Sequence, residues 1–283
     1  MKVGIGLPNA THGVRGPELV AFAREAEQSG FSSLGTIDRV AYENYEALVA
    51  LGAAAAVTER IDLLTSILLA PLRTNTALFA KQAASVDGIS DGRLVLGLAV
   101  GAREDDFAVS GVPYRERGRA FDRQLDELRR LWDGDEVGPD PARPGGPTLI
   151  LGGSVDAAFR RAAKHGAGWM MGGGPPDRFT ELVPKLEAAW HEAGRDGEPR
   201  KLALGYFSLG PDAERNAHEK LAHYYAYLGD GARQMADAVP KDADAVNAYL
   251  DAFEEAGCDE FVFFPSDSSP EQVGLLREAI GKR

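Results

Sequence analysis

The chain lacks the features that mark several large classes of protein. It has a single cysteine, Cys258, among its 283 residues, so no disulfide can form within the chain. It has no uncharged apolar run of about 18 residues, so we expect no membrane-spanning helix. Basic residues are in the minority, because 31 Lys and Arg stand against 43 Asp and Glu, a formal net charge of −12. This balance argues against nucleic acid or an anionic membrane surface as the main partner.

Two further absences narrow the class. No group of His, Cys, Asp and Glu has the spacing of a zinc site, so we predict no metal. The start, MKVGIGLPNA, alternates like a strand and lacks the apolar core of a signal peptide, which favours a cytoplasmic location. The 44% hydrophobic and 26% charged residues are ordinary for a globular protein with a substantial core. We expect a single domain over residues 1–283.

The segment 61–107 is the most informative part of the chain. Two near-continuous apolar runs, Ile61–Leu69 and Leu94–Val100, flank the stretch Asn75–Ile89, whose apolar residues have helical spacing. Strands that are buried on both faces and joined by a helix form a right-handed parallel βαβ unit. The polar clusters PLRTN and GAREDD follow the two strands, where α/β proteins place their functional sites. This pattern is typical of an enzyme core.

Apolar runs and helical periodicities alternate along the rest of the chain. They predict an α/β fold of the (β/α)8 TIM-barrel class, with Asp212–Val239 as a helical insertion after strand seven. The alternative is an open doubly wound sheet, but PNATHG rather than GxGxxG follows the first strand. The predicted strands are Val3–Leu7, Phe31–Ile37, Ile61–Leu69, Leu94–Val100, Thr148–Leu151, Ala167–Met171, Lys201–Leu209 and Glu260–Phe264. The predicted helices are Gly16–Gln28, Tyr45–Thr58, Asn75–Ile89, Arg119–Trp132, Ser154–His165, Pro176–Ala193, Asp242–Ala256 and Pro270–Ile280.

Four segments carry a motif pattern that is more specific than the periodicity. The densest runs from Pro71 to Gly101, and the others are GFSSLGTIDR at Gly30–Arg39, the Arg-Gly-Arg-x-Phe-Asp sequence from Arg117, and LILGGS at Leu149–Ser154. Together they resemble the bacterial-luciferase-like family of flavin- or deazaflavin-dependent oxidoreductases. The resemblance implies a (β/α)8 barrel that binds FMN or the deazaflavin coenzyme F420 at the carboxyl ends of its strands. It also implies hydride or oxygen chemistry on a small organic substrate, a homodimer, and a lid formed by the insertion.

The resemblance also indicates where the cofactor binds. It places a non-proline cis peptide bond behind the cofactor ring, and the bond between residues 66 and 67 is the matching one; the alternative is that Ser66 is a small strand residue packed in the barrel. The Gly-Gly-Ser turn at 152–154 precedes a predicted helix, whose N–H groups and partial positive charge suit a flavin phosphate. The glycines after the sixth strand either line this site or form a turn. The candidate cofactor-binding residues are Ser66, Ile67, Arg103, Gly152, Gly153, Ser154, Gly172 and Gly173.

Arg103, after the fourth strand, is the candidate fixed cation for a phosphate or an anionic reduced flavin. Its alternative role is a salt bridge from Arg103 to Glu104, Asp105 or Asp106. The chain departs from relatives at two nearby positions. Bacterial luciferase has an arginine where this chain has Val100, and deazaflavin-dependent sugar-phosphate dehydrogenases have a catalytic glutamate where it has Ala102.

Three residues are candidates for the catalytic step. Asp38 and Arg39 end the second strand, where relatives often have Asp-His. Arg39 cannot act as a base, but it could bind an anionic substrate or stabilise a flavin anion; an ion pair is the alternative. His12, in the loop after the first strand, has a pKa range that suits acid–base work, although a loop histidine is often simply solvated.

Three hypotheses for function follow. The leading one is a two-component monooxygenase that uses oxygen and FMN reduced by a separate flavin reductase, since the chain shows no NADH-binding fingerprint. The alternative is an F420-dependent dehydrogenase or reductase. The third is a non-catalytic barrel that binds flavin.

Overall fold

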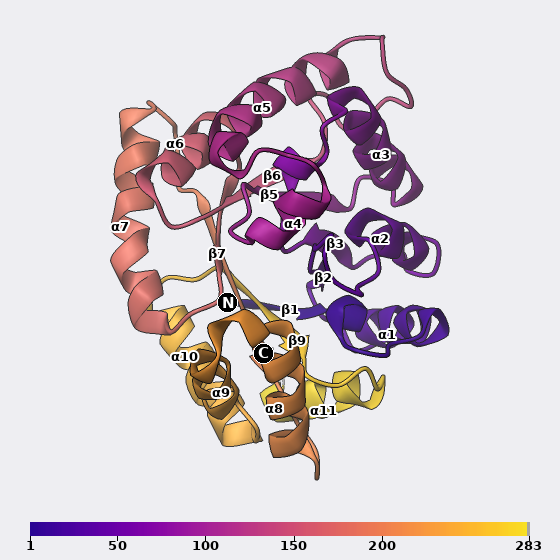
Figure 1. The fold of residues 1–283 in the computed structure, drawn as a ribbon, viewed down its shortest axis with the longest axis vertical. Helices are drawn as coiled ribbons and strands as arrows, with labels where there is room; N and C mark the ends of the chain where they lie inside the picture. The colour runs from indigo at the N-terminus through magenta and orange to yellow at the C-terminus, as the bar shows by residue number, and fades with distance from the viewer. Residues whose placement is uncertain (282–283) are drawn as a thin grey trace.

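The computed structural model describes residues 1–281, in which parallel strands and helices alternate (Figure 1). The strands form one sheet in the order β3-β2-β1-β9-β8-β7-β6-β5-β4, and pairing of β3 with β5 closes it into a barrel. The predicted (β/α)8 barrel is therefore confirmed. The strands are β1 (Lys2–Gly6), β2 (Ser33–Thr36), β3 (Asp62–Thr65), β4 (Leu68–Leu69), β5 (Leu94–Ala99), β6 (Thr148–Gly152), β7 (Gly168–Gly172), β8 (Arg200–Phe207) and β9 (Glu260–Pro265).

The third barrel strand differs from the prediction of one continuous run over Ile61–Leu69. A cis peptide bond between Ser66 and Ile67 divides it into β3 and β4. The backbone bulges toward β5 at this point, where the Thr65 hydroxyl donates a 2.7 Å hydrogen bond to the Gly97 carbonyl. A Cβ at Gly97 would lie 1.9 Å from the Thr65 carbonyl oxygen, so only glycine fits beside the bulge.

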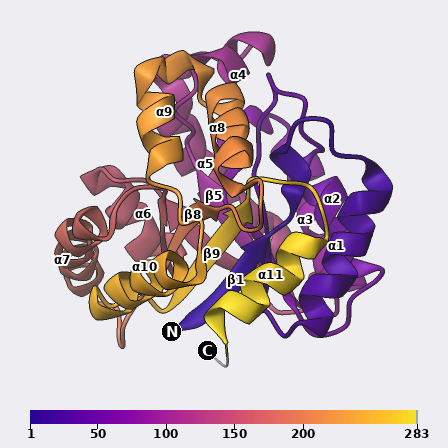
Figure 2. The ribbon, with the colours of Figure 1, turned by 90° about the horizontal axis from the view of Figure 1, so that it is seen from below.

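Within residues 1–281, eight helices follow the barrel strands in sequence. They pack around the outside of the barrel (Figures 1 and 2). Their apolar faces are buried against the strands; in α5, for example, Phe121, Leu125 and Leu128 recur at helical spacing and are almost fully buried. Burying one such side chain contributes about 1.5–3 kcal/mol. These helices are α1 (Gly16–Gln28), α2 (Ala47–Ala55), α3 (Thr76–Ile89), α5 (Arg117–Asp133), α6 (Asp156–His165), α7 (Pro176–Glu192), α10 (Ala243–Glu255) and α11 (Glu271–Ile280).

The short helix α4 (Glu104–Val109) was not predicted, because its sequence looks like a polar loop. Three acidic residues occupy its first turn, where the partial positive charge of a helix N-terminus favours carboxylates. Single 3-10 turns occur at Pro8–Ala10, Ala70–Leu72, Tyr114–Glu116 and Ala226–Leu228.

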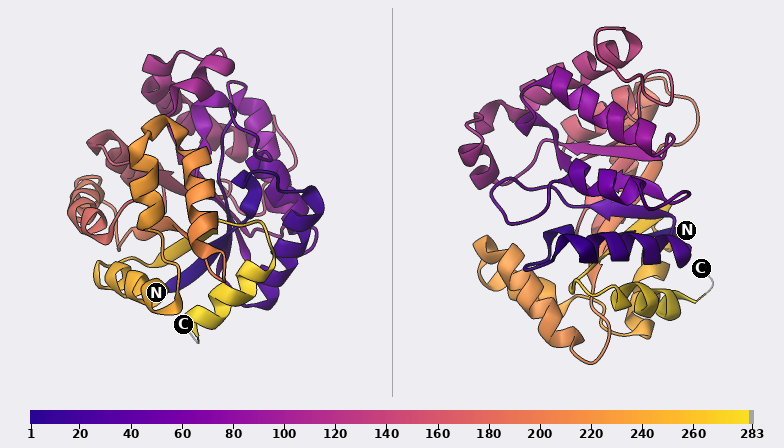
Figure 3. Two further views of the ribbon diagram at one scale, coloured as in Figure 1. Left: turned by 60° about the horizontal axis from the view of Figure 1, so that its bottom comes forward. Right: turned by 90° about the vertical axis from the view of Figure 1, so that its right-hand side faces the viewer.

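The predicted insertion consists of two helices, α8 (Ala213–Tyr224) and α9 (Asp230–Asp237), and we call residues 212–239 the lid. The helices lie side by side at one end of the barrel (Figures 2 and 3). Leu221 and Val239 of the lid belong to the same buried cluster as Met170 and Phe264 inside the barrel. The lid therefore covers the barrel end at which the strands have their carboxyl termini.

Two other expectations concern single features. Cys258 is buried, and burial raises the pKa of its thiol to about 12, which agrees with an unreactive side chain. None of the helices within residues 1–281 is long and apolar enough to cross a membrane.

Candidate functional site

A cavity of about 390 Å³ opens at the carboxyl ends of β5, β6 and β7, and we call it the β5–β7 cavity. It brings together most of the predicted cofactor-binding residues, although they come from three separate parts of the chain. The members of the predicted set that line it are Ile67, Gly152, Gly153, Ser154, Gly172 and Gly173. The expected cis bond before Ile67 is present. The walls near Ile67 are apolar and include Ala99, Val100 and Met170.

Glycines give this cavity its space. A Cβ at Gly152 would lie 2.4 Å from the Cδ1 atom of Ile67, so a larger residue would push Ile67 away. Gly173 has a φ of +66° and would meet no atom within 4 Å, so it borders open space. The first turn of α6 directly follows the 152–154 turn, and its free N–H groups and partial positive charge favour an anion at this point. Asp156 in that turn is exposed and does not cap the helix.

Three arginines from three different helices also line the β5–β7 cavity: Arg117, Arg161 and Arg178. Arg117 stacks on the Tyr114 ring with 3.6 Å between its Cζ atom and the ring centroid. Its Nε atom donates to the Gly101 carbonyl at 3.2 Å. This arrangement holds the guanidinium without neutralising it.

The other two arginines differ in their partners. The Nε atom of Arg161 lies 2.6 Å from Asp122, so part of its charge is compensated. Arg178 is exposed in the first turn of α7, and no side-chain hydrogen bond or ion pair holds it within residues 1–281. None of the three was among the candidate residues predicted from the sequence. Only Arg117 had a signal, since it opens a family motif that was quoted without a role.

Asp38 lies outside this cavity and is fully engaged. Its carboxylate oxygens accept hydrogen bonds from Arg73 at 2.5 and 2.9 Å. The Leu69 backbone N–H donates to it at 2.8 Å, so Asp38 fixes the end of β4. Since the side chain is buried, its observed role is structural.

Arg39 is also buried and paired. Its Nε atom lies 2.5 Å from Asp106 and its Nη2 atom 2.9 Å from Asp105. Burial lowers the pKa of Arg39, but the two ion pairs outweigh this effect and raise the pKa above its ordinary value. The guanidinium lies 5.6 Å from the Tyr42 ring and 5.7 Å from the Tyr224 ring of the lid. Its Nη1 atom has no hydrogen-bond partner in the described part of the chain, so a buried donor remains open at the barrel mouth.

Arg103 points to the lid rather than into the β5–β7 cavity. It pairs with Asp105 at 2.7 Å and stacks on the Tyr227 ring at 3.8 Å. It also donates to the Tyr224 carbonyl at 3.4 Å. The salt bridge that was the alternative role of Arg103 is therefore present, and the cation joins α4 to the lid. His12 is exposed, pairs with Glu43 and lines a different groove.

A second cavity, of about 360 Å³, lies between the lid and the ends of β7 and β8, and we call it the lid cavity. Its walls are mostly apolar, with Leu221, Met235 and Val239 supplied by the lid. Tyr206 also lines this cavity, and its hydroxyl lies 3.1 Å from the Tyr225 hydroxyl. Burial raises the pKa of Tyr206 well above 10, so the phenol is neutral and can donate a hydrogen bond. Both cavities are lined by Gly173, so they adjoin.

The fold and these two cavities define a (β/α)8-barrel enzyme with a cradle suited to a phosphorylated cofactor beside an apolar substrate cavity. Glycines, a helix N-terminus and uncompensated arginines are the groups that hold a phosphate. The residues therefore fit the tail of a flavin or a deazaflavin.

Comparison with known proteins agrees with this class. A family model described as luciferase-like monooxygenase matches residues 1–273, so the chain belongs to the luciferase-like monooxygenase family. An uncharacterized protein of Mycobacterium tuberculosis is 31% identical over 212 residues, which are 62% of this chain and 72% of that protein. The F420-dependent glucose-6-phosphate dehydrogenase of Amycolatopsis mediterranei is 24% identical and covers 93% of this chain and 92% of its own.

Among solved structures, monooxygenase RslO1 from Streptomyces bottropensis has the same fold, with a TM-score of 0.81. It is 22% identical, and the match covers 99% of this chain and 98% of that chain. The predicted family and the prediction of an oxidoreductase are thus confirmed. The proteins that resemble this chain thus include an F420-dependent dehydrogenase and a monooxygenase.

Proposed function

We propose that this protein is an oxidoreductase that uses coenzyme F420 to exchange hydride with a small, mostly apolar alcohol or carbonyl compound. The observation that carries the proposal is the trio of arginines around the glycine cradle of the β5–β7 cavity. FMN carries one phosphate, whereas F420 carries a phosphodiester and the carboxylates of a glutamyl tail. A tail with several negative charges matches three cations that lie within a chain of net charge −12. The F420-dependent relative from Amycolatopsis mediterranei supports the same choice.

The chain's own residues would orient the cofactor and keep water away. Arg117, Arg178 and the N-terminus of α6 would hold the charged tail. Ile67 would support the ring from behind, and Met170 would exclude water from it. The bound deazaflavin would supply the hydride chemistry; the protein would supply position and charge.

The lid cavity suits an apolar substrate rather than a sugar phosphate. Ala102 and Arg39 stand where the sugar-phosphate dehydrogenases have a glutamate and a histidine, and Ala102 lines the β5–β7 cavity without adding charge. In the lid cavity, Tyr206 would donate a hydrogen bond to the substrate oxygen, because its phenol stays protonated. The tyrosine would thereby fix the orientation of the reacting carbon.

A two-component FMN-dependent monooxygenase is the second candidate. The apolar walls of the lid cavity favour it, since a site that excludes water also protects reactive oxygen chemistry. This candidate requires a separate flavin reductase as a partner. A homodimer is proposed for either candidate, and light scattering would test it.

Titration of the apo-protein with F420 and, separately, with FMN tests the choice. We expect F420 to bind in the micromolar range or tighter and to raise the melting temperature, since a ligand of the native state stabilises by mass action. FMN is expected to bind at least about tenfold more weakly. Selective FMN binding would replace the first proposal by the monooxygenase, and binding of neither would favour the non-catalytic barrel.

A further inference from the structure

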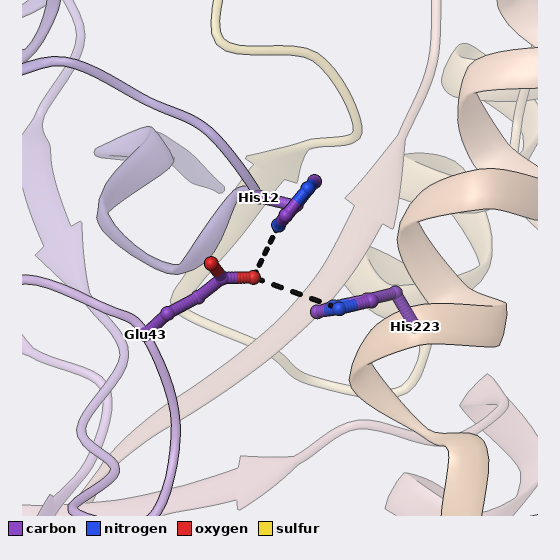
Figure 4. A group of neighbouring side chains, drawn as sticks. All are labelled: His12, Glu43 and His223. Atoms are coloured by element: carbon purple, nitrogen blue, oxygen red, sulfur yellow. Dashed lines mark hydrogen bonds and ion pairs between the residues drawn. The ribbon is translucent and has the colours of Figure 1, made fainter.

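A group of three metal-ligating side chains lies away from both cavities: His12, Glu43 and His223 (Figure 4). His12 lies in the loop that leads from β1 to α1, Glu43 in the loop after β2, and His223 in the last turn of the lid helix α8. One nitrogen or oxygen atom of each residue lies within 4.8 Å of the others. Three distant parts of the chain therefore present ligand atoms to one point.

The Glu43 carboxylate is the centre of the group. Its Oε1 atom is paired with Nδ1 of His12 and lies 3.6 Å from Nε2 of His223. The two imidazole rings are tilted by 39°, with 4.8 Å between their centroids. Zinc bonds of about 2.0–2.2 Å place neighbouring ligand atoms roughly 3–3.5 Å apart, so small side-chain shifts would admit an ion. All three side chains are at least 45% exposed, which leaves an open path for it.

A fourth residue orients one of the ligands. The Tyr42 hydroxyl lies 2.7 Å from Nδ1 of His223, on the ring edge opposite the nitrogen that faces Glu43. Tyr42 is itself held by the Arg39 guanidinium and by edge-on packing against Tyr224 at 5.1 Å. Metal-binding histidines commonly use their second nitrogen in this way, because the outer contact fixes the ring and the tautomer.

We propose that His12, Glu43 and His223 bind one divalent transition-metal ion of the zinc class, and that this ion fastens the lid to the barrel. Two imidazoles and one carboxylate are a preferred ligand set for such ions, and water would complete the coordination. The adjoining groove of about 570 Å³, lined by both histidines, has room for that water. Without metal, the lid is held here by exposed polar contacts, which contribute little stability.

The lid contains a similar group that serves as an internal control. Glu214, His218 and Asp237 also lie within 4.8 Å of one another, but they offer only one imidazole. The Lys241 ammonium lies 3.3 Å from Glu214 and already neutralises part of that cluster. Because this group has a single imidazole and its Glu214 is already in a direct ion pair, we expect it not to bind zinc.

Calorimetric titration of chelator-treated full-length protein with Zn²⁺ tests the site. We expect one equivalent to bind with a dissociation constant in the micromolar range or tighter. His12→Ala or His223→Ala should each weaken binding about 100-fold or more, and Tyr42→Phe about tenfold to 100-fold. His218→Ala should leave the affinity unchanged. Co²⁺ gives a second readout, because its visible absorption reports nitrogen ligation.

Amide hydrogen exchange tests whether the ion fastens the lid to the barrel. In wild-type protein, Zn²⁺ should slow amide hydrogen exchange over residues 212–239, and in His12→Ala it should not. The variants change exposed side chains, and equal metal-free melting curves would establish that they fold. Absence of zinc binding, or binding that survives in both His12→Ala and His223→Ala, would overturn the site. Zinc binding without slower exchange in the lid would overturn the fastening role.

Discussion

The two sides of the barrel mouth use charge in opposite ways. On the β5–β7 side, Arg117 and Arg178 line a cavity, and neither has a carboxylate partner among the described residues. On the side of β1 to β3, Asp38 is buried and paired with Arg73, and Arg39 is buried and paired with Asp106. Both sides place polar residues after strand ends, so that position alone does not distinguish a ligand site from a structural one. The difference is whether other parts of the chain already compensate the charge.

This contrast has an energetic basis. In a buried ion pair, the attraction between the two charges offsets the free-energy cost of removing each from water. Removing one partner is therefore costly, because the other charge stays buried without compensation. An uncompensated arginine at a cavity rim keeps its water and costs the fold little, and its interaction energy remains available for a ligand. Substitutions on the β1–β3 side should therefore lower the stability of the fold, and substitutions on the β5–β7 side should lower ligand affinity.

The largest effect is expected for Asp106→Ala. The substitution removes the partner of the buried Arg39 and also the acceptor of the Val40 and Ala41 backbone N–H groups, at 2.8 and 2.7 Å. We expect a loss of about 3–5 kcal/mol in the free energy of unfolding, measured by urea denaturation. Asp105→Ala is the matched control, since Asp105 is 42% exposed, and it should cost no more than about 1 kcal/mol. Equal losses in both variants would contradict a structural role for the buried pair.

The double variant Arg117→Ala, Arg178→Ala should act on the other side. Each lost charge-assisted hydrogen bond weakens binding by about tenfold to 100-fold, so we expect at least a 100-fold loss of F420 affinity. The melting temperature of the apo-protein should change little. Arg160→Ala, a neighbouring exposed arginine that does not line the cavity, is the control. If affinity were unchanged in the double variant, the β5–β7 cavity would not be the cofactor site.

Tyr206→Phe tests the lid cavity with a smaller expected effect. Loss of one neutral hydrogen bond to the substrate should lower kcat/KM about tenfold, measured with F420 and a panel of short-chain alcohols. Cofactor affinity should stay the same. Tyr249→Phe provides the comparison, because the Tyr249 hydroxyl donates its proton to the Gly174 carbonyl at 3.1 Å, whereas the Tyr206 hydroxyl meets another hydroxyl and can accept from it. A Tyr206 variant with full activity would remove this residue from the substrate site.

The smallest effect is expected for Arg103→Ala. Its contacts with Asp105 and the Tyr227 ring are partly exposed, so global stability should fall by about 1 kcal/mol or less. Hydrogen exchange over 212–239 should nevertheless become faster, because the link between α4 and the lid is lost. A large loss of cofactor affinity instead would restore the original prediction that Arg103 is a phosphate ligand.

The glycine pair at 152–153 and the cis bond before Ile67 could be predicted from the sequence because both signals are local. A glycine pair before a helix is visible within five residues, and the family motifs are continuous. The three arginines were missed because they lie on three different helices, and nothing local separates Arg161 from its exposed neighbour Arg160. His12, Glu43 and His223 were missed as a group for the same reason, since 180 positions separate His223 from Glu43.

Residue order along the chain was thus sufficient for the alternation of strands and helices, the barrel, the insertion and the family. These properties depend on periodicity and turn chemistry within short segments. The tertiary structure alone decided which charges are available to a ligand. Asp38 and Arg39 are engaged because Arg73 and Asp106 fold against them, and Arg178 is available because no carboxylate within residues 1–281 folds against it. Charge compensation depends on distances of a few ångströms between residues far apart in sequence, and only the folded chain sets those distances.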